Sequence, residues 1–120
     1  MHELSIAQAI VEEAERVARA HAASRILRVA VRVGRLSGVD AEALAFAFPL
    51  AAEGSLAADA QLAIDQVPAQ AVCGACGRAF EPEALFLVCP HCGASDATLR
   101  GGRDLLITAV ELAAPEENAP

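Results

Sequence analysis

The sequence predicts a small α/β (α+β) protein, in which a small mixed sheet is flanked by two helices and a cysteine-bearing module is inserted between two strands. Apolar residues repeat at helical spacing near the N-terminus and alternate in strand-like segments elsewhere. Four cysteines form two Cys-x-x-Cys pairs within one window of 20 residues. A chain of 120 residues and 12.4 kDa has room for one modest core and a satellite that needs its own cross-link.

The first helix is predicted from a capping box followed by a helical repeat. Ser5-Ile6-Ala7-Gln8 has the form of a capping box, which starts the helix at Ile6 and leaves Met1 to Glu3 ahead of it. Core-facing residues then recur at helical spacing, at Ala7, Ile10, Val11, Ala14, Val17, Ala18 and His21. On the solvent side, glutamates stand four residues before arginines, as Glu12 with Arg16 and Glu15 with Arg19. We expect an amphipathic helix of about four turns.

Three strands of the main sheet are predicted along the rest of the chain. In the first, apolar residues alternate with Arg28, Ala30 and Arg32, and they would face the core at Leu27, Val29, Val31 and Val33. The second spans Gln61 to Val67 and is stopped by Pro68. The third spans Arg103 to Leu112, which is mostly apolar and long enough to return to the same sheet.

A second helix is expected between the first two strands. Asp40 can cap it, and it would run from Ala41 to about Glu53, before Gly54 ends it. The predicted buried side chains are Leu44, Phe48 and Leu50. Pro49 cannot donate to the carbonyl of Ala45, so we expect a kink or an early break there.

The cysteine pairs have the spacing of a zinc ribbon. Twelve residues separate Cys73-Gly74-Ala75-Cys76 from Cys89-Pro90-His91-Cys92, and two such turns can close a tetrahedral thiolate cage around zinc. Iron in a rubredoxin-like cage is an alternative. Redox catalysis is another, because Cys-Pro-His-Cys occurs in thioredoxin-like oxidases, but the residues from Gly93 to Asp96 make a poor start for the helix that this chemistry requires. The role of His91 stays open.

These elements divide the chain into a predicted α/β domain, an inserted domain and a tail. Residues 1–69 and 99–113 would form the α/β domain, and residues 70–98 the zinc-ribbon domain. Residues 114–120, with two prolines and two glutamates, are expected to be a flexible acidic tail.

Composition excludes several classes of partner. The formal net charge is −7, with nine arginines and no lysine, and aromatic residues are only four phenylalanines, so nucleic-acid binding is not expected. No apolar run approaches a membrane span and no secretory signal is visible. Cysteines paired for metal ligation fit a reducing compartment, so we expect a soluble cytoplasmic protein. No serine-histidine-acid set, phosphate loop or carboxylate dyad stands out, which predicts a protein that is not an enzyme.

The N-terminus is a second candidate metal site. In Met1-His2-Glu3, the α-amine, the imidazole and the first amide nitrogens form a nitrogen-rich set that suits square-planar Ni(II) or Cu(II). The bulky second residue should protect Met1 from methionine aminopeptidase, which prefers small neighbours. Most terminal histidines bind no metal, so these three residues alone do not establish a metal site.

Three segments together resemble a known family. Met1-His2-Glu3-Leu4-Ser5-Ile6, the strand end Val31-Arg32-Val33-Gly34-Arg35-Leu36-Ser37-Gly38-Val39 and the two cysteine pairs resemble the HypA/HybF nickel metallochaperones of [NiFe]-hydrogenase maturation. The resemblance spans nearly the whole chain. It implies Ni(II) cargo held by His2 with the Met1 amine and the backbone amides near His2 and Glu3. It also implies structural Zn(II), held by Cys73, Cys76, Cys89 and Cys92.

The same resemblance implies partners and leaves one main alternative. It implies delivery of nickel, with the partner GTPase HypB, to the hydrogenase large subunit, and in some organisms a contribution to urease maturation. The expected oligomeric state is a monomer or a weak homodimer. The alternative is a zinc-ribbon interaction module without nickel cargo. A nucleic-acid-binding ribbon is disfavoured, since residues 73–93 contain one arginine, Arg78, against Glu81 and Glu83.

Overall fold

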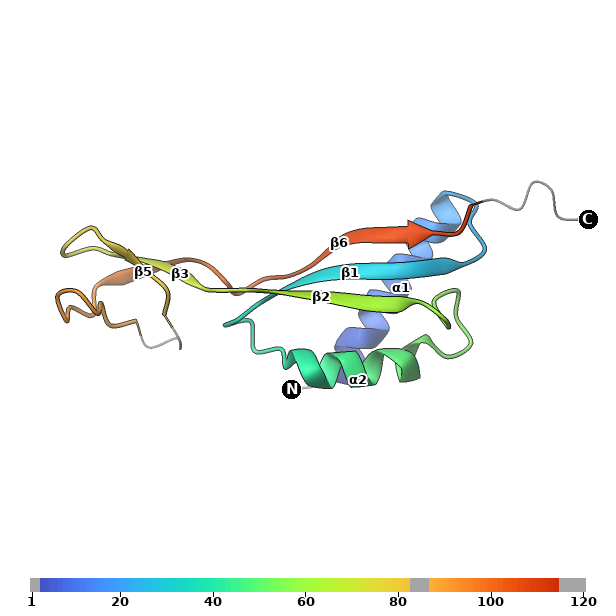
Figure 1. Cartoon of the computed structure of the whole chain (residues 1–120), viewed down its shortest axis with the longest axis horizontal. Helices are drawn as coiled ribbons and strands as arrows, with labels where there is room; N and C mark the ends of the chain where they lie inside the picture. Colours follow the sequence, from blue (N-terminus) through green and yellow to red (C-terminus); the bar gives the residue numbers. More distant parts are fainter. Residues whose placement is uncertain (1–2, 83–86, 115–120) are drawn as a thin grey trace, which may run out of the picture. The chain divides into compact units, whose positions relative to one another are not determined.

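The computed structural model describes residues 3–82 and 87–114, which form two compact units. The first unit comprises Met1–Val31, Asp40–Asp65 and Ile107–Pro120, and the second comprises Arg32–Val39 and Gln66–Leu106. The elements follow in the order α1 (Glu3–Ala20), β1 (Ile26–Gly34), α2 (Ala41–Ala52), β2 (Gln61–Val67), β3 (Gln70–Cys73), β4 (Ala79–Phe80), β5 (Ala97–Gly101) and β6 (Leu105–Leu112) (Figure 1). Among the described residues, neither helix is both long and apolar enough to cross a bilayer.

The larger sheet has the strand order β2-β1-β6 and is mixed, as predicted. Backbone hydrogen bonds at the two ends of β1 show that β1 and β2 run in the same direction. The Ile26 amide donates to the Leu56 carbonyl at 2.9 Å, and the Arg35 amide donates to the Val67 carbonyl at 2.8 Å. The hydrogen bonds beside β6 show that β1 and β6 run in opposite directions. The Ala113 amide donates to the Arg25 carbonyl at 3.0 Å, and the Gly34 amide donates to the Asp104 carbonyl at 2.7 Å. β1 is therefore parallel to β2 and antiparallel to β6. The helix α2 supplies the long crossover that a parallel pair requires.

The helix α1 is amphipathic, as expected, but it begins earlier than the capping box predicted. It starts at Glu3, so this residue lies in the first turn instead of ahead of the helix. A carboxylate suits the positive end of the helix dipole, and the Glu3 Oε2 atom also accepts a hydrogen bond from the amide of Asp40 at 3.1 Å. The buried residues are Ala7, Ile10, Val11, Ala14 and Ala18. Val17 is half-buried, whereas His21 is exposed, so the predicted core position of His21 was wrong.

The charged side chains of α1 only partly follow the predicted pairs. Arg19 lies 3.5 Å from Glu15, as expected, whereas Arg16 binds Glu13 instead of Glu12. The predicted solvent-facing position of Glu15 was wrong, because its side chain is only 17% exposed. Its Oε2 atom accepts a hydrogen bond from the amide of Leu56 at 3.0 Å. This bond ties the middle of α1 to the loop after α2.

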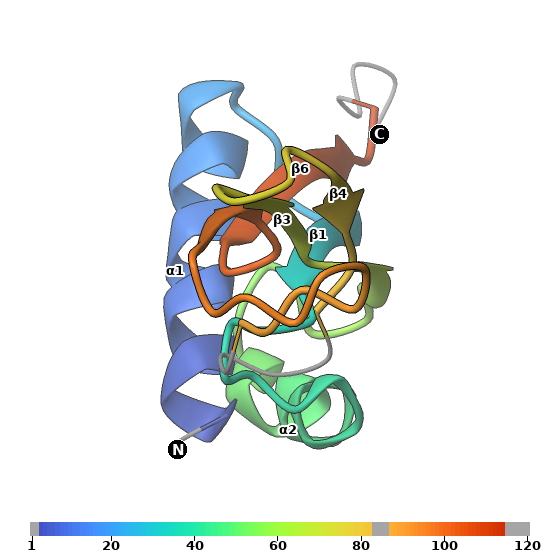
Figure 2. The ribbon, with the colours of Figure 1, turned by 90° about the vertical axis from the view of Figure 1, so that its left-hand side faces the viewer.

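The helix α2 is capped by Asp40, as predicted. The Asp40 Oδ1 atom accepts hydrogen bonds from the amides of Glu42 at 3.0 Å and Ala43 at 3.2 Å. The expected early break was wrong, because the helix continues through Pro49 to Ala52. The first turns of α1 lie beside α2 in both views of the ribbon (Figures 1 and 2).

Two residues predicted to be buried are exposed. Leu44 and Phe48 of α2 are buried, as predicted, but Leu50 is 55% exposed. At about 100° per residue, Leu50 points roughly 200° away from Phe48 and therefore faces outward. In β1, Val29, Val31 and Val33 are buried as expected, whereas Leu27 is 40% exposed and Ile26 takes the core position at the start of the strand.

The second unit contains a small antiparallel sheet with the order β4-β3-β5. Ala71 of β3 pairs with Phe80 on one side and Leu99 on the other. The cysteine spacing predicts a ribbon here but does not predict these short strands. The sheet lies between β2 and β6 in the chain, so the predicted insertion of a cysteine-bearing module into an α+β fold is confirmed.

Candidate metal centre

The two cysteine pairs form turns with the same backbone hydrogen bonds. In the first turn, Gly77 donates to the Cys73 carbonyl at 2.9 Å, and in the second, Gly93 donates to the Cys89 carbonyl at 2.8 Å. The backbone amide of the first cysteine in each turn is also a donor. The Cys73 amide donates to the Arg78 carbonyl and the Cys89 amide to the Ala94 carbonyl, both at 2.9 Å. Gly77 and Gly93 have φ angles of 78° and 76°, which explains why glycine follows each pair.

Backbone amides point at the sulfurs of the first cysteines. The Cys73 Sγ atom accepts from the amides of Ala75 at 3.3 Å and Cys76 at 3.4 Å. The Cys89 Sγ atom accepts from the amide of His91 at 3.4 Å. At Cys73 the amide hydrogens directed at sulfur favour the thiolate over the thiol, and the thiolate is the form that binds metal.

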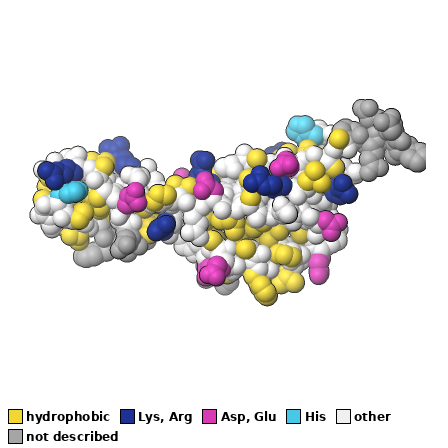
Figure 3. Space-filling model, viewed as in Figure 1, with side chains coloured by type: hydrophobic (Ala, Val, Ile, Leu, Met, Phe, Trp, Pro, Cys, Tyr) yellow, Lys and Arg dark blue, Asp and Glu magenta, His cyan; other side chains and the backbone are white. Residues whose placement is uncertain are grey.

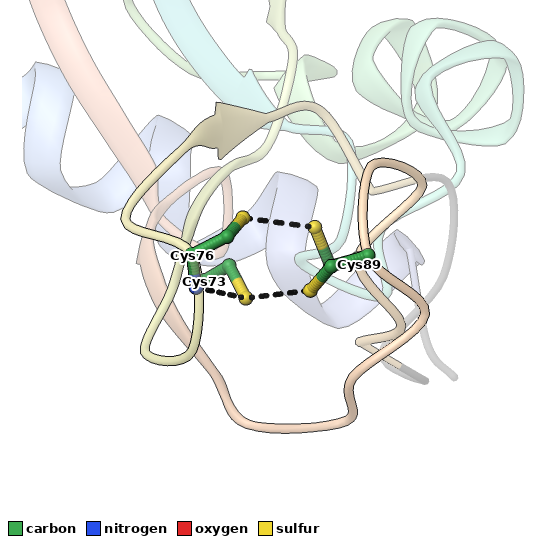
Figure 4. Close-up of side chains that lie close together, drawn as sticks. Cys73, Cys76 and Cys89 are labelled. Atoms are coloured by element: carbon green, nitrogen blue, oxygen red, sulfur yellow. Dashed lines mark hydrogen bonds between the residues drawn. The ribbon is translucent and has the colours of Figure 1, made fainter.

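The four sulfurs converge on one point. The Cys73 and Cys92 Sγ atoms are 3.6 Å apart, those of Cys76 and Cys89 are 3.7 Å apart, and all four lie within 4.8 Å of one another. Zinc–thiolate bonds of about 2.3 Å in a tetrahedron require sulfur–sulfur distances of about 3.8 Å. Figure 4 shows the labelled Cys73, Cys76 and Cys89 side chains directed toward one another. The cluster therefore fits a tetrahedral ion held by four thiolates.

Without an ion, the thiols do not share their protons equally. The amide of Cys76 is the main cause that lowers the pKa of Cys73 to about 7. For Cys92, the amide of Ala94 favours the thiolate, but contact with Cys73 and burial together outweigh it and raise the pKa to about 11. Cys92 therefore holds its proton more tightly than Cys73 does, and a metal ion would have to displace it.

The geometry also bears on the redox alternative. A low-pKa thiol of the thioredoxin type needs a cysteine at the start of a helix. Cys89 is followed by a turn, and the described helices α1 and α2 both lie outside this segment.

His91 is exposed, and its Nδ1 atom is 3.4 Å from Nη1 of Arg78. Within the described part of the chain, the grouped metal-binding side chains are the four cysteines alone.

At the N-terminus, the structure describes one of the three residues predicted to hold nickel. Met1 and His2 lie outside the described residues. Glu3 opens α1, and its carboxylate meets the amide of Asp40, 37 residues later in the chain. The sequence identifies Asp40 only as a helix cap. No local spacing in the sequence could have revealed this pairing, because it depends on how α1 packs against α2.

Comparison with known proteins identifies similar chains across almost the full length. Residues 1–112 match a family model described as "HypA: Hydrogenase/urease nickel incorporation, metallochaperone, hypA". A hydrogenase maturation factor HypA from Chlorobium limicola is 41% identical over 112 residues, covering 93% of this chain and 97% of that protein. A hydrogenase maturation factor HypA from a Synechococcus strain is 45% identical over 112 residues, covering 93% and 99%.

Two solved structures have a similar fold. The solution structure of the Ni metallochaperone HypA from Helicobacter pylori superposes with a TM-score of 0.67 at 30% sequence identity, covering 95% of this chain and 99% of that one. A second solution structure, of a protein titled HypA, gives a TM-score of 0.68 at 29% identity, covering 94% and 97%. The likeness extends to both units, because each comparison covers nearly all of the chain.

Proposed function

The chain belongs to the HypA family of hydrogenase and urease nickel-incorporation metallochaperones, and we propose that it binds Ni(II) at its N-terminus and delivers it for insertion into [NiFe]-hydrogenase. The observation that carries this proposal is the family match over residues 1–112, which includes both the Met-His-Glu start and the four cysteines. On this proposal the protein is a carrier without catalytic turnover, and nickel is its cargo.

Nickel would be held by nitrogen atoms of the first three residues. The proposed donors are the Met1 α-amine, the His2 imidazole and the backbone amides near His2 and Glu3. The position of Glu3 supports this choice, because the first amides of an α-helix have no partner within the helix. An amide that already lacks a helical acceptor can lose its proton to a metal without breaking the helix.

The bond between Glu3 and Asp40 supports the proposal in a second way. It fixes Glu3, the residue next to His2, against the start of α2, so the Glu3 amide begins from a restricted set of positions. Restricting the donors before binding lowers the entropy cost of closing a chelate. It also engages one oxygen of the Glu3 carboxylate, which is consistent with a site built from nitrogen.

The cysteine cluster would hold zinc as a structural ion. Cys73, Cys76, Cys89 and Cys92 supply four thiolates at distances that fit a tetrahedron. Zinc there would join two turns separated in the chain and stabilise the β4-β3-β5 sheet, which is too small to hold itself together by burial alone.

Delivery requires partners, and the family supplies the proposed set. They are the GTPase HypB and the hydrogenase large subunit in the cytoplasm, with urease maturation proteins where urease is served. Copper binds nitrogen ligands more tightly than nickel does. Selectivity would therefore come from metal availability and from the partner. The second candidate function is a zinc-ribbon interaction module without nickel, which the well-formed cysteine cluster alone would also support.

The deciding experiment is a calorimetric Ni(II) titration of untagged, zinc-loaded protein. It is repeated with His2→Ala and with a variant that carries one additional residue before Met1, which displaces the α-amine while leaving every side chain in place. One nickel per chain, lost in both variants, is the expected result. Nickel binding that is indifferent to both changes would reject the N-terminal site, and zinc content without nickel binding would favour the interaction module.

A further inference from the structure

The outer face of α2 carries a continuous stripe of five residues with an unusual charge pattern. Successive positions on one face of a helix are three or four residues apart, and this spacing joins Glu42, Phe46, Pro49, Leu50 and Glu53. They fall within about 100° of the helix circumference. We call these residues the α2 stripe. Its centre is apolar and each end is a glutamate.

The apolar centre of the α2 stripe faces solvent. Phe46 is 78% exposed and Leu50 is 55% exposed, and Pro49 between them is exposed as well. Burial of the opposite face explains this, since Leu44 and Phe48 point into the core. Figure 3 shows hydrophobic side chains gathered over α2, with acidic side chains near both ends of that patch. An exposed phenylalanine beside an exposed leucine lies outside the core and suits a contact with a partner.

The charges at the ends of the α2 stripe select the kind of partner. α2 carries no basic residue, and Glu42 and Glu53 are both exposed. A second copy of the chain is a poor occupant, because two stripes packed face to face bring glutamate against glutamate in either direction. An apolar surface flanked by lysine or arginine would instead meet opposite charges at both ends.

We propose that the α2 stripe is a docking surface for an amphipathic helix of a partner protein, whose apolar residues lie between lysines or arginines. The apolar contact would supply affinity and the flanking charges would set the register. α2 begins next to Asp40, whose amide binds Glu3, so a docked helix would also lie close to Glu3, one of the proposed nickel-binding residues. Only this last point rests on the proposed function, because docking itself requires no nickel.

The test uses nickel-free, zinc-loaded full-length protein and a synthetic amphipathic helical peptide of about 18 residues. This peptide has leucines on one face, flanked by lysines. One matched peptide replaces its lysines with glutamates, and another keeps the lysines but replaces the leucines with serines. Amide NMR shifts report where each peptide binds. We expect the leucine–lysine peptide to perturb α2 amides and to bind at least about tenfold more tightly than either matched peptide.

Variants of the α2 stripe complete the test. Phe46→Ser combined with Leu50→Ser should weaken peptide binding about tenfold or more, whereas Leu106→Ser, at a leucine of β6 that is 50% exposed, should not. Circular dichroism checks that each variant folds, and a nickel titration of the double variant should be unchanged, which separates docking from cargo binding. Equal binding of all peptides, shifts away from α2, or an α2-dependent dimer in ultracentrifugation would overturn the proposal.

Discussion

The carboxylate of Glu3 accepts a hydrogen bond from the backbone amide of Asp40 at 3.1 Å, across 37 residues of sequence. Asp40 in turn caps α2 with its own side chain. The start of α1 and the start of α2 are thus joined by one polar contact, and the residue adjacent to His2 is part of it. Changes at this contact should therefore affect both helix packing and the proposed nickel site.

Glu3→Ala removes the acceptor of this hydrogen bond and should lower both stability and nickel affinity. The free energy of unfolding should fall by about 1 kcal/mol, the usual net value of one hydrogen bond. Nickel affinity should fall severalfold, because the Glu3 amide is no longer held in place before the chelate closes. Chemical denaturation and calorimetry measure the two effects. Glu12→Ala, an exposed position on the same helix, is the control and should change neither quantity. Wild-type nickel affinity in Glu3→Ala would show that the anchor has no part in binding.

Asp40→Ala should destabilise α2 by removing its cap. Two amides, those of Glu42 and Ala43, lose their acceptor, and loss of such a cap costs about 1 kcal/mol. Asp40→Asn should restore most of this stability, because asparagine caps helices nearly as well as aspartate. Thermal unfolding of the three proteins tests the order. An asparagine variant as unstable as the alanine variant would mean that the negative charge matters more than the cap.

Zinc affinity should fall as the pH is lowered. In the metal-free cluster the pKa of Cys92 is raised to about 11, so this thiol is protonated across the neutral range and must lose its proton on binding. The release of this one proton weakens zinc binding about tenfold for each unit by which the pH is lowered. The pKa of Cys73, lowered to about 7, adds a further loss of affinity once the pH falls below that value. A competition titration with a chromophoric chelator between neutral and mildly acidic pH measures the slope. A flat profile would contradict thiolate ligation by this cluster.

Gly102 should tolerate no side chain, whereas its neighbour Gly101 should. Gly102 has a φ of +91°, and an added Cβ would overlap Ala69, which is buried. At Gly101 an added Cβ meets nothing within 4 Å. Gly102→Ala should therefore cost about 2 kcal/mol or more, through backbone strain and overlap together, and Gly101→Ala should cost less than about 1 kcal/mol. Denaturant unfolding of the paired variants checks the difference. Equal stabilities would show that the loop relaxes around the new methyl group.

The residues that the sequence predicts well are those whose signal is local. Asp40 caps α2, and Gln61 to Val67 form β2 with the expected ends, because helix capping and the stop at Pro68 act over a few residues. The spacing of the four cysteines likewise predicted one cluster, and the structure brings their sulfurs together. The cluster could be predicted because each Cys-x-x-Cys pair forms a short turn of fixed geometry.

The predictions that failed depend on packing between distant elements. The capping box did not start α1, because Glu3 extends the helix and binds Asp40. Glu15 was expected in solvent and is bound to the amide of Leu56. Neither partner is near in sequence, so no periodicity could identify it. Leu50 is different, since its angular distance from Phe48 was already present in the sequence and would have placed it on the outer face.

Replacing either phenylalanine of α2 by alanine should change the free energy of unfolding by very different amounts, although the two residues are only two positions apart. Phe48 is 1% exposed and Phe46 is 78% exposed. Phe48→Ala should leave a cavity in the core and cost about 3–5 kcal/mol, a large share of the stability of a small domain. Phe46→Ala should change stability by less than about 0.5 kcal/mol, because the side chain is not part of the core. Chemical denaturation of both variants measures this contrast. A strongly destabilised Phe46→Ala protein would mean that this side chain supports the fold, and the α2 stripe would then lose its role as a free docking surface.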